Sequence, residues 1–236
     1  MNFMIYGDDC RHAILSEMLT DAGWSRKAPA DLLILSPKEH FAFYTDVLKE
    51  NAIIWGGPAS DTDSLAAAGY KKAAQSAAFR TKNSVYTAEG ALALAITESS
   101  FAICENRVFV LGYGFLGKEC SRLFGALGAD ITVYSKEPEE IALADRDGFR
   151  ALPLEQLSAL DGTLLLNTIP FPILDNLPVS ANDTPALLIE LASIPCCTHE
   201  IPGIRSLPAG ALPSRFSPYS AAKLIFEEIE NQFRKE

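Results

Sequence analysis

Three glycines, Gly112, Gly114 and Gly117, form the pattern G-x-G-x-x-G directly after the apolar run at residues 108–111. Apolar residues at helical spacing follow and continue to Leu127. In this context the first glycine permits a tight turn, the second leaves room for a pyrophosphate, and the third lets helix and strand pack closely. The start of such a helix also offers backbone N–H groups to an anion. The pattern therefore predicts a dinucleotide-binding α/β unit, with a purely structural glycine turn as the alternative.

The end of the next predicted strand, residues 131–135, bears on which dinucleotide is bound. It ends in Tyr134 and Ser135, and Lys136 follows. NAD sites usually carry Asp or Glu there, which accepts a hydrogen bond from the ribose 2′-hydroxyl. A hydroxyl and an ammonium group instead favour a 2′-phosphate, and Glu137 and Glu139 are expected to lie beyond the ribose. The sequence therefore predicts NADP, with NAD as the alternative.

Further cofactor contacts are predicted at the carboxyl ends of strands, where α/β sheets bind their ligands. The backbone of the glycine turn adds Tyr113, Phe115 and Leu116. The segment after the strand TLLLN is expected to flank the nicotinamide ribose or to be a simple capped turn; it comprises Asn167, Thr168, Ile169 and Pro170. Glu190 and Ser193 follow the next strand, where Glu190 is either a cofactor contact or an ordinary strand-end acid.

Cys196 and Cys197, with His199 and Glu200 close in sequence, raise the question of a metal or nucleophile. Zinc sites usually need a second pair of ligands elsewhere, and the chain has only two other histidines. The segment is therefore predicted to be a loop of small residues without a metal, and a vicinal disulfide stays open. The five cysteines are odd in number and show no disulfide-rich spacing, which predicts free thiols and a cytoplasmic protein.

Apolar runs and helical spacings alternate along the chain in two series, which predicts an α/β fold of two Rossmann-like parallel-sheet domains. The first series reads strand, helix, strand, helix, strand. The predicted domains are a smaller N-terminal substrate or partner domain, residues 1–82 plus 216–236, and an NAD(P)-binding domain, residues 83–215. A C-terminal helix, capped at Ser217, is expected to return to the first domain. Thr87 is predicted to cap a helix that connects the two domains.

Composition excludes several classes of function. The net charge of the 236-residue chain is −10, so a surface that follows nucleic acid phosphates is not expected. No apolar run reaches the roughly 18–20 residues that span a bilayer. The first residues lack the basic start and apolar core of a signal peptide, which again favours the cytoplasm.

Taken together, these motifs resemble the family formed by the A subunits of dipicolinate synthase, a spore-specific oxidoreductase. The resemblance covers residues 83–222 most clearly, through NSVYTAEGALALAI, VLGYGFLG, FGALGADITVYSK, NTIPFPIL, LLIELASIP and LPAGALPSRFSPYSAAKLI. It extends more loosely to YGDDCRHAILSEMLTDAG at the N-terminus. The resemblance implies a cleft between two domains, a role in sporulation, and NADP-linked oxidation of dihydrodipicolinate to dipicolinate with a flavoprotein-like B subunit. A homodimer is expected from base rates alone.

Such a reaction needs cations for the substrate's carboxylates and a base for its proton. Arg11 follows the first strand and is the cation expected to bind the substrate in the first domain; a surface helix arginine is the alternative. Arg215 is a second candidate partner for a carboxylate. Glu89 and His12 are the candidate bases.

The chain departs from the family pattern after the ELAS motif. Ile194, Pro195, Cys196 and Cys197 stand where the family has arginine, proline and two glycines. A later loop also departs, at Ala209, Ser214, Arg215 and Tyr219, and the chain is shorter. These differences favour the alternative of a dinucleotide-binding partner or regulatory subunit that is catalytically inactive. The third interpretation is a hydrolase or lyase with tightly held NAD, like adenosylhomocysteine hydrolase, which the missing strand-end acid disfavours.

Overall fold

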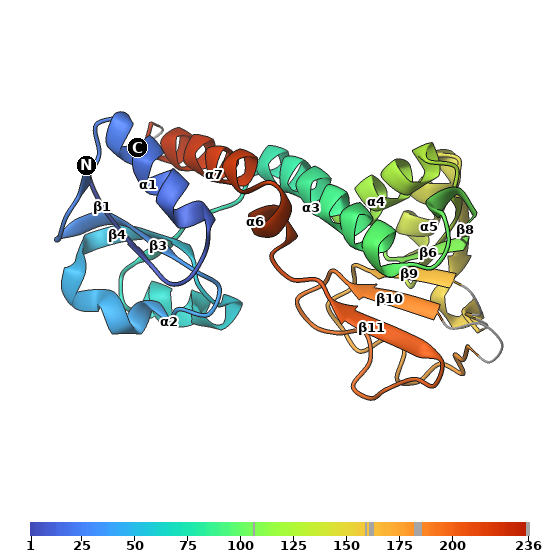
Figure 1. Ribbon diagram of the computed structural model, residues 1–236. Helices are drawn as coiled ribbons and strands as arrows, with labels where there is room; N and C mark the ends of the chain where they lie inside the picture. The colour runs from blue at the N-terminus through green and yellow to red at the C-terminus, as the bar shows by residue number, and fades with distance from the viewer. Residues whose placement is uncertain (106, 159, 161–162, 182–185, 235–236) are drawn as a thin grey trace. The chain divides into compact units, whose positions relative to one another are not determined.

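A computed structural model describes the chain from residue 1 to 234, except residues 106, 159, 161–162 and 182–185. Two compact units are present (Figure 1). The first consists of Met1–Arg80 together with Ser217–Glu236, and the second of Thr81–Phe216. Each unit is built on one parallel sheet, and this confirms the predicted α/β class.

The first unit has five parallel strands in the order β2-β1-β3-β4-β5. Their bounds are β1 (Asn2–Tyr6), β2 (Ser25–Arg26), β3 (Ala30–Leu35), β4 (Leu48–Gly56) and β5 (Lys71–Lys72). The helices of this unit are α1 (Arg11–Asp21), α2 (Thr62–Ala67) and α7 (Pro218–Phe233), and α7 packs against α1. The indole N–H of Trp24 donates to Glu230 at 2.8 Å, and the backbone N–H of Ser76 donates to Glu228 at 2.7 Å. These bonds fix the C-terminal helix within the first unit.

One local prediction for this part of the chain is confirmed in kind, and another is wrong. The segment between β3 and β4 is helical as predicted, in the form of the 3-10 helix η1 (Phe41–Val47), and Phe41 belongs to the core cluster that includes Leu33 and Ile54. The connecting helix α3 (Ala77–Glu98) begins ten residues before Thr87. The hydroxyl of Ser76 accepts a 3.0 Å hydrogen bond from the backbone N–H of Phe79 and so acts as the cap.

The second unit has six parallel strands in the order β11-β10-β9-β6-β7-β8. The strands are β6 (Arg107–Leu111), β7 (Asp130–Ser135), β8 (Arg150–Pro153), β9 (Thr163–Asn167), β10 (Ala186–Glu190) and β11 (Ile204–Pro208). The helices are most of α3, then α4 (Phe115–Ala126), α5 (Pro138–Arg146) and α6 (Leu212–Phe216). The chain enters at the central strand β6, fills one side of the sheet, and then crosses over to β9. In sheets of this order ligands bind at the carboxyl ends of the two strands where the direction of winding reverses, which here are β6 and β9.

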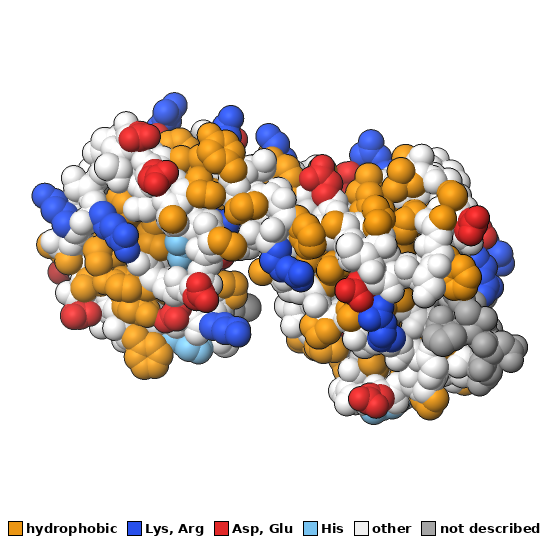
Figure 2. Space-filling view, viewed as in Figure 1, with side chains coloured by type: hydrophobic (Ala, Val, Ile, Leu, Met, Phe, Trp, Pro, Cys, Tyr) orange, Lys and Arg blue, Asp and Glu red, His pale blue; other side chains and the backbone are white. Residues whose placement is uncertain are grey.

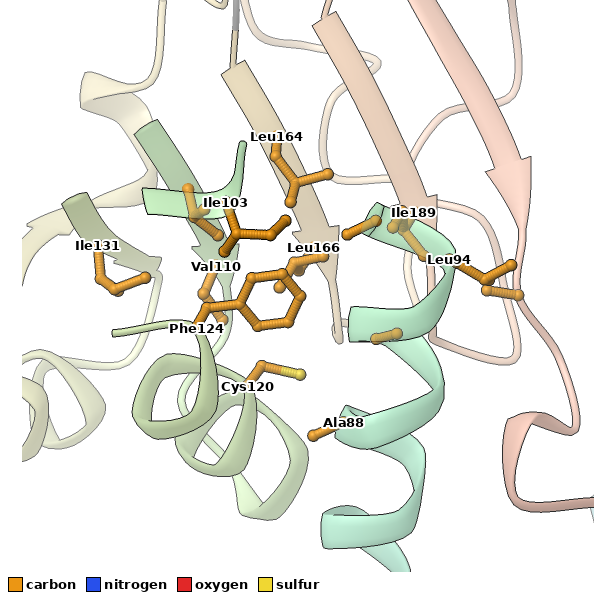
Figure 3. Packing of buried hydrophobic residues seen from close by; sticks show 14 of the residues in the cluster. Ala88, Leu94, Ile103, Val110, Cys120, Phe124, Ile131, Leu164, Leu166 and Ile189 are labelled. Carbon is orange, nitrogen blue, oxygen red and sulfur yellow. The ribbon is translucent and has the colours of Figure 1, made fainter. Parts of the chain in front are cut away.

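Both faces of this sheet are buried, which explains why its strands read as continuous apolar runs. One face packs against α3 and α4, where Phe124 and Cys120 lie over Val110 and Leu166 (Figure 3). The other face contributes Leu111 and further residues to a second core cluster. Side chains from both faces therefore pack around the central strands, next to the sheet edge formed by the carboxyl ends of β6 and β9.

The surface carries mixed charge. On the face drawn in Figure 2, Lys and Arg side chains are interspersed with Asp and Glu and are not gathered into one patch. Among the described residues, no helix combines the length and the apolar character that crossing a membrane requires.

Candidate functional site

The glycine turn between β6 and α4 has the geometry that its sequence predicts. Gly112 adopts a positive φ of 88°, and its N–H donates to the carbonyl of Tyr134 at 2.8 Å. A Cβ at Gly117 would lie 2.2 Å from the carbonyl oxygen of Gly112, so the close approach of helix and strand requires glycine. A Cβ at Gly114 would meet only a carboxylate oxygen of Glu140, at 3.8 Å. The turn is therefore closely packed beneath and open above Gly114, which fits a pyrophosphate.

Hydrogen bonds connect the residue after β9 to the carboxyl end of β6. The hydroxyl of Thr168 donates to the carbonyl of Leu111 at 2.7 Å, and its backbone N–H donates to the same oxygen at 3.1 Å. A Cβ on Gly112 would collide with the side chains of Thr168 and Ile169, at 2.8 and 2.9 Å. Two of the predicted cofactor segments, residues 112–117 and residues 167–169, thus meet at the reversal point of the sheet. Pro170 follows them and is exposed.

Tyr113 turns its ring away from the open side of the turn. Its side chain belongs to the core cluster and is only 1% exposed, and its hydroxyl donates to Asp147 at 3.0 Å. Burial, with Asp147 as the second cause, raises the pKa of this phenol. Only the backbone of Tyr113 faces the turn, and its N–H donates to Glu140 at 2.8 Å. Phe115, by contrast, is exposed, and Leu116 is half-buried.

A carboxylate that was not expected from the sequence lies at this turn. Glu140, in the first turn of α5, accepts hydrogen bonds from the N–H of Tyr113 and from the hydroxyl of Ser135, at 2.8 and 2.7 Å. A cavity of about 270 Å³ opens beside it. The cavity is lined by Tyr113, Gly114, Phe115, Lys118, Glu139, Glu140 and Leu143. The sequence does contain a signal: Pro138 opens the helix, so Glu140 holds the third helical position, whose side chain reaches back past the helix start.

The residues at the end of β7 that were predicted to contact the cofactor differ in their exposure to solvent. Ser135 is 1% exposed; its hydroxyl donates to Glu140 and accepts from the backbone N–H of Glu137 at 3.1 Å. Tyr134 is also buried, whereas Lys136 is exposed. The hydroxyl that was expected to receive a 2′-phosphate therefore already bonds a carboxylate.

The next part of the sheet edge is a buried polar pair. The side-chain amide of Asn167 donates to Glu190 at 2.7 Å, and its carbonyl oxygen accepts from the N–H of Ile169 at 3.0 Å. Asn167 is fully buried, and Glu190 is 5% exposed. Glu190 also accepts from the backbone N–H of Cys196 at 3.0 Å. These bonds match the alternative interpretation of Glu190 as a hydrogen-bonded strand-end acid, while Ser193 is exposed.

The two adjacent cysteines lie against Glu190. No disulfide joins any of the five cysteines, all of which belong to the described residues. The Sγ atom of Cys196 donates to Glu190 at 3.3 Å, and Cys196 is fully buried while Cys197 is half-buried. Burial, followed by the charge of Glu190, raises the pKa of both thiols.

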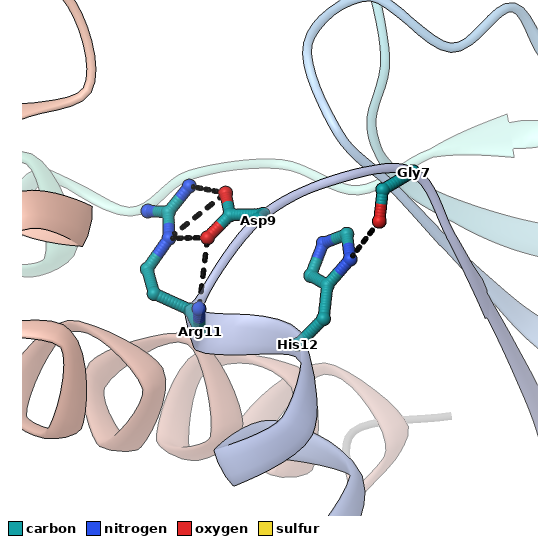
Figure 4. A network of polar contacts seen from close by, with 4 residues as sticks. All are labelled: Gly7, Asp9, Arg11 and His12. Atoms are coloured by element: carbon teal, nitrogen blue, oxygen red, sulfur yellow. Dashed lines mark hydrogen bonds and ion pairs between the residues drawn. The ribbon is translucent and has the colours of Figure 1, made fainter.

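The predicted catalytic residues are divided between the two units. In the first unit, the guanidinium of Arg11 binds the carboxylate of Asp9 through two nitrogens, at 2.5 and 2.9 Å (Figure 4). This ion pair neutralises locally the charge that was expected to bind a substrate. His12 contacts the carbonyl of Gly7 at 3.2 Å, and burial lowers the pKa of its imidazole.

The other candidates belong to the second unit. Glu89 is exposed on α3 and lines a cavity of about 510 Å³ together with Glu119 and Arg122. Arg215 lies in the last turn of α6, and its guanidinium lies 5.2 Å from the ring centroid of Phe216. Their catalytic roles stay predictions.

Comparison with known proteins agrees with the geometry. No family model matches the chain. The A subunit of dipicolinate synthase from Bacillus subtilis (strain 168) is 32% identical over 149 residues, which is 61% of this chain and 50% of that protein. The chain is similar in sequence to the dipicolinate synthase A subunit over this stretch. The resemblance of its motifs is thereby confirmed, although the match spans only half the length of the curated relative.

Solved structures of the dipicolinate synthase A subunit share the fold over almost the whole chain. The protein from Bacillus subtilis superposes with a TM-score of 0.75 and 22% identity, covering 100% of this chain and 96% of that chain. The protein from Bacillus halodurans gives a TM-score of 0.73 and 19% identity, covering 98% and 97%. At these identities the structures show a common fold.

Proposed function

We propose that this protein is an oxidoreductase that uses a nicotinamide dinucleotide and acts on a small carboxylated ring compound of the dihydrodipicolinate type. The observation that carries the proposal is the glycine turn at the reversal point of the sheet, closed beneath Gly117 and open above Gly114. The relationship to the dipicolinate synthase A subunit supports the substrate class. The odd number and the spacing of the cysteines in the sequence support the proposed cytoplasmic location.

When bound, the nicotinamide supplies the hydride acceptor. The chain's own residues position it: the turn backbone takes the pyrophosphate, and the segment at Asn167 and Thr168 flanks the ring side of the site. Oxidation of a dihydropyridine dicarboxylate releases one hydride to the cofactor and one proton to a base, and the ring becomes aromatic. Glu89 or His12 is the proposed base. A flavoprotein-like B subunit is the proposed partner, as the family resemblance implies.

The position of Glu140 revises the expected choice of cofactor. A carboxylate beside the ribose accepts a hydrogen bond from a 2′-hydroxyl and repels a 2′-phosphate. Glu140 supplies such a carboxylate from α5, and Ser135 supports it with a hydrogen bond. Lys136 remains the one feature at this strand end that favours NADP. We therefore expect NAD to bind more tightly than NADP, against the expectation from the sequence.

A titration with NADH and NADPH, followed by nicotinamide fluorescence, tests both parts of this proposal. The unmodified chain should bind NADH more tightly. Glu140→Gln should weaken NADH binding roughly tenfold, since a charged hydrogen bond is lost. It should also reduce the difference in affinity between NADH and NADPH. Glu137→Gln, an exposed acid of the same segment that does not line this cavity, is the matched control. Tighter binding of NADPH by the unmodified chain would refute the role of Glu140, and binding of neither would refute the proposed function.

A second function has specific support. Arg11, the cation expected to bind the substrate, is paired with Asp9. By the family resemblance, Ile194 also stands at an arginine position, which removes a second positive charge. These facts favour a dinucleotide-binding partner subunit without catalysis of its own. The two functions are separated by mixing the chain with the preferred cofactor and freshly generated dihydrodipicolinate, with and without a B subunit. Product absorbance supports the enzyme; cofactor binding without turnover supports the partner subunit. Gly114→Val should abolish binding in both cases.

A further inference from the structure

One cluster of reactive side chains is left unexplained by dinucleotide binding. The carboxylate of Glu190, at the end of β10, and the thiols of Cys196 and Cys197 are brought together by the loop that follows the strand. One ligand atom from each of the three residues lies within 4.8 Å of the other two. One oxygen and two sulfurs grouped in this way could hold a metal ion.

We infer that Glu190, Cys196 and Cys197 form a binding site for a thiophilic divalent ion of the zinc class. Thiolate ligands select Zn²⁺ and similar soft ions over Mg²⁺ or Ca²⁺. By the family resemblance, both cysteines stand at glycine positions, so the site is particular to this chain. It does not depend on the dinucleotide.

The distances are compatible with tetrahedral coordination after a small adjustment. Zn–S and Zn–O bonds of roughly 2.3 and 2.1 Å place neighbouring donors roughly 3.6–3.8 Å apart in a tetrahedron. The Sγ atom of Cys196 is already 3.3 Å from Glu190. The donor atoms, which lie within 4.8 Å of one another, must approach by at most about 1 Å. Rotation about one side-chain bond of a cysteine supplies this change. Cys197, the less buried of the two thiols, has the space to make it.

The carboxylate is held in place for such a role. One oxygen of Glu190 accepts from Asn167 at 2.7 Å, and the other accepts from the backbone N–H of Cys196 at 3.0 Å. Hydrogen bonds from neighbouring groups orient metal ligands in just this manner. Because Asn167 and Glu190 end adjacent strands in register, the oxygen ligand is fixed by the sheet.

The exchange of protons for an ion preserves the charge of the cluster. With two protonated thiols beside one carboxylate, the net charge is negative by one unit. One divalent ion that replaces two thiol protons leaves the same net charge. Binding therefore adds no uncompensated buried charge, which is the main cost of placing ions inside proteins.

The cluster also has an open side. A cavity of about 840 Å³ is lined by Glu190 and Cys197, and further along by Thr198 and His199. The carboxylate of Asp175 holds this loop by accepting from the N–H and hydroxyl of Thr198, at 2.8 and 2.7 Å. Three protein ligands with a fourth position open to solvent describe a site that can bind a small molecule on the ion.

Titration of the reduced chain with Cd²⁺ alone tests the inference, because cadmium–thiolate bonds absorb in the ultraviolet. One equivalent should produce the thiolate charge-transfer band. Cys197→Ser should remove most of the band, and Glu190→Gln should weaken the affinity at least tenfold. Cys104→Ser, which removes an exposed thiol of the same unit, should leave the titration unchanged.

Two further measurements separate a metal site from a mere pair of thiols. A trivalent arsenical needs two thiols and no carboxylate, so Glu190→Gln should still bind it. If Glu190→Gln binds Cd²⁺ as tightly as the unmodified chain, or if Cys197→Ser keeps the band, the inference is overturned. Circular dichroism and NADH binding of each variant show whether a lost band reflects lost ligands or a lost fold; a folded Cys197→Ser chain that keeps its dinucleotide binding makes the result decisive.

Discussion

The two units begin with the same supersecondary design and use it differently. Each has an interior strand, a glycine with positive φ and a helix: β1, Gly7 and α1 in the first unit, and β6, Gly112 and α4 in the second. A carboxylate stands at each turn. In the first unit it is Asp9, from the turn itself, and in the second it is Glu140, from another helix.

Whether the carboxylate comes from the turn itself or from another helix affects whether the turn has room for a ligand. Asp9 accepts from the backbone N–H of Arg11 at 2.9 Å and also binds its guanidinium, so cation and anion of the first turn satisfy each other (Figure 4). A Cβ on Gly7 would lie 2.2 Å from the hydroxyl oxygen of Ser36, so that turn is filled from the neighbouring strand end. The second turn keeps open space above Gly114, and its carboxylate can exchange partners with a ligand. The same fold thus yields one turn that the chain fills with its own side chains and one that stays open for the proposed dinucleotide.

The largest expected effect comes from closing the binding turn. Gly117→Ala places a Cβ 2.2 Å from the carbonyl oxygen of Gly112, so helix α4 must move away from β6. We expect a loss of about 2–3 kcal/mol in the free energy of unfolding of the second unit and loss of NADH binding. Denaturant titration and nicotinamide fluorescence measure the two effects.

Gly210→Ala is the control for this substitution, since a Cβ there meets nothing within 4 Å. It should leave both measurements unchanged. Normal NADH affinity in Gly117→Ala would contradict the assignment of the binding turn.

A smaller effect, on stability alone and not on NADH binding, is expected in the first unit. Asp9→Asn removes the charge that binds Arg11 and should lower the free energy of unfolding by about 1–2 kcal/mol, because the Asp9 carboxylate is 5% exposed. NADH binding should not change. Asp8→Asn, at the exposed neighbouring position, is the control. If Asp9→Asn altered NADH affinity, the division of labour between the turns would be wrong.

Much of this comparison could be predicted from the sequence. Continuous apolar runs marked β6, β9 and β10 because parallel strands are buried on both faces. The glycines of the second turn stood directly between such a run and a helical pattern. Local spacing therefore sufficed for the α/β class and for the position of the turn.

The rest depends on side-chain contacts that the local sequence pattern does not indicate. Glu140 reaches Tyr113 across 27 positions, and nothing near the glycines indicates it. An acid was expected only at the strand end, and its absence there favoured NADP. Arg11 was assigned to a substrate because the pairing with Asp9, two residues away, depends on how the turn folds. The proximity of Cys196 to Glu190 likewise follows from a loop that closes on itself.

The smallest expected effect concerns pH and again distinguishes the two turns. Burial lowers the pKa of His12 below its usual value of 6.5, although Asp9 and the carbonyl of Gly7 oppose the shift. The folded state therefore binds fewer protons than the unfolded state in the window just below pH 6.5, and stability falls as the pH decreases through it. His12→Gln should lose less stability over this window.

Urea unfolding of the first unit, measured above pH 6.5 and about one unit below it, checks this expectation. His199→Gln, which removes an imidazole from the second unit, is the matched control and should retain the full pH dependence of the first. Because His12 contacts the carbonyl of Gly7, its protonation acts on the turn that the chain has already filled with its own side chains. NADH affinity should therefore stay constant over the same window in both variants, and a parallel change in NADH affinity would show that the first turn takes part in binding.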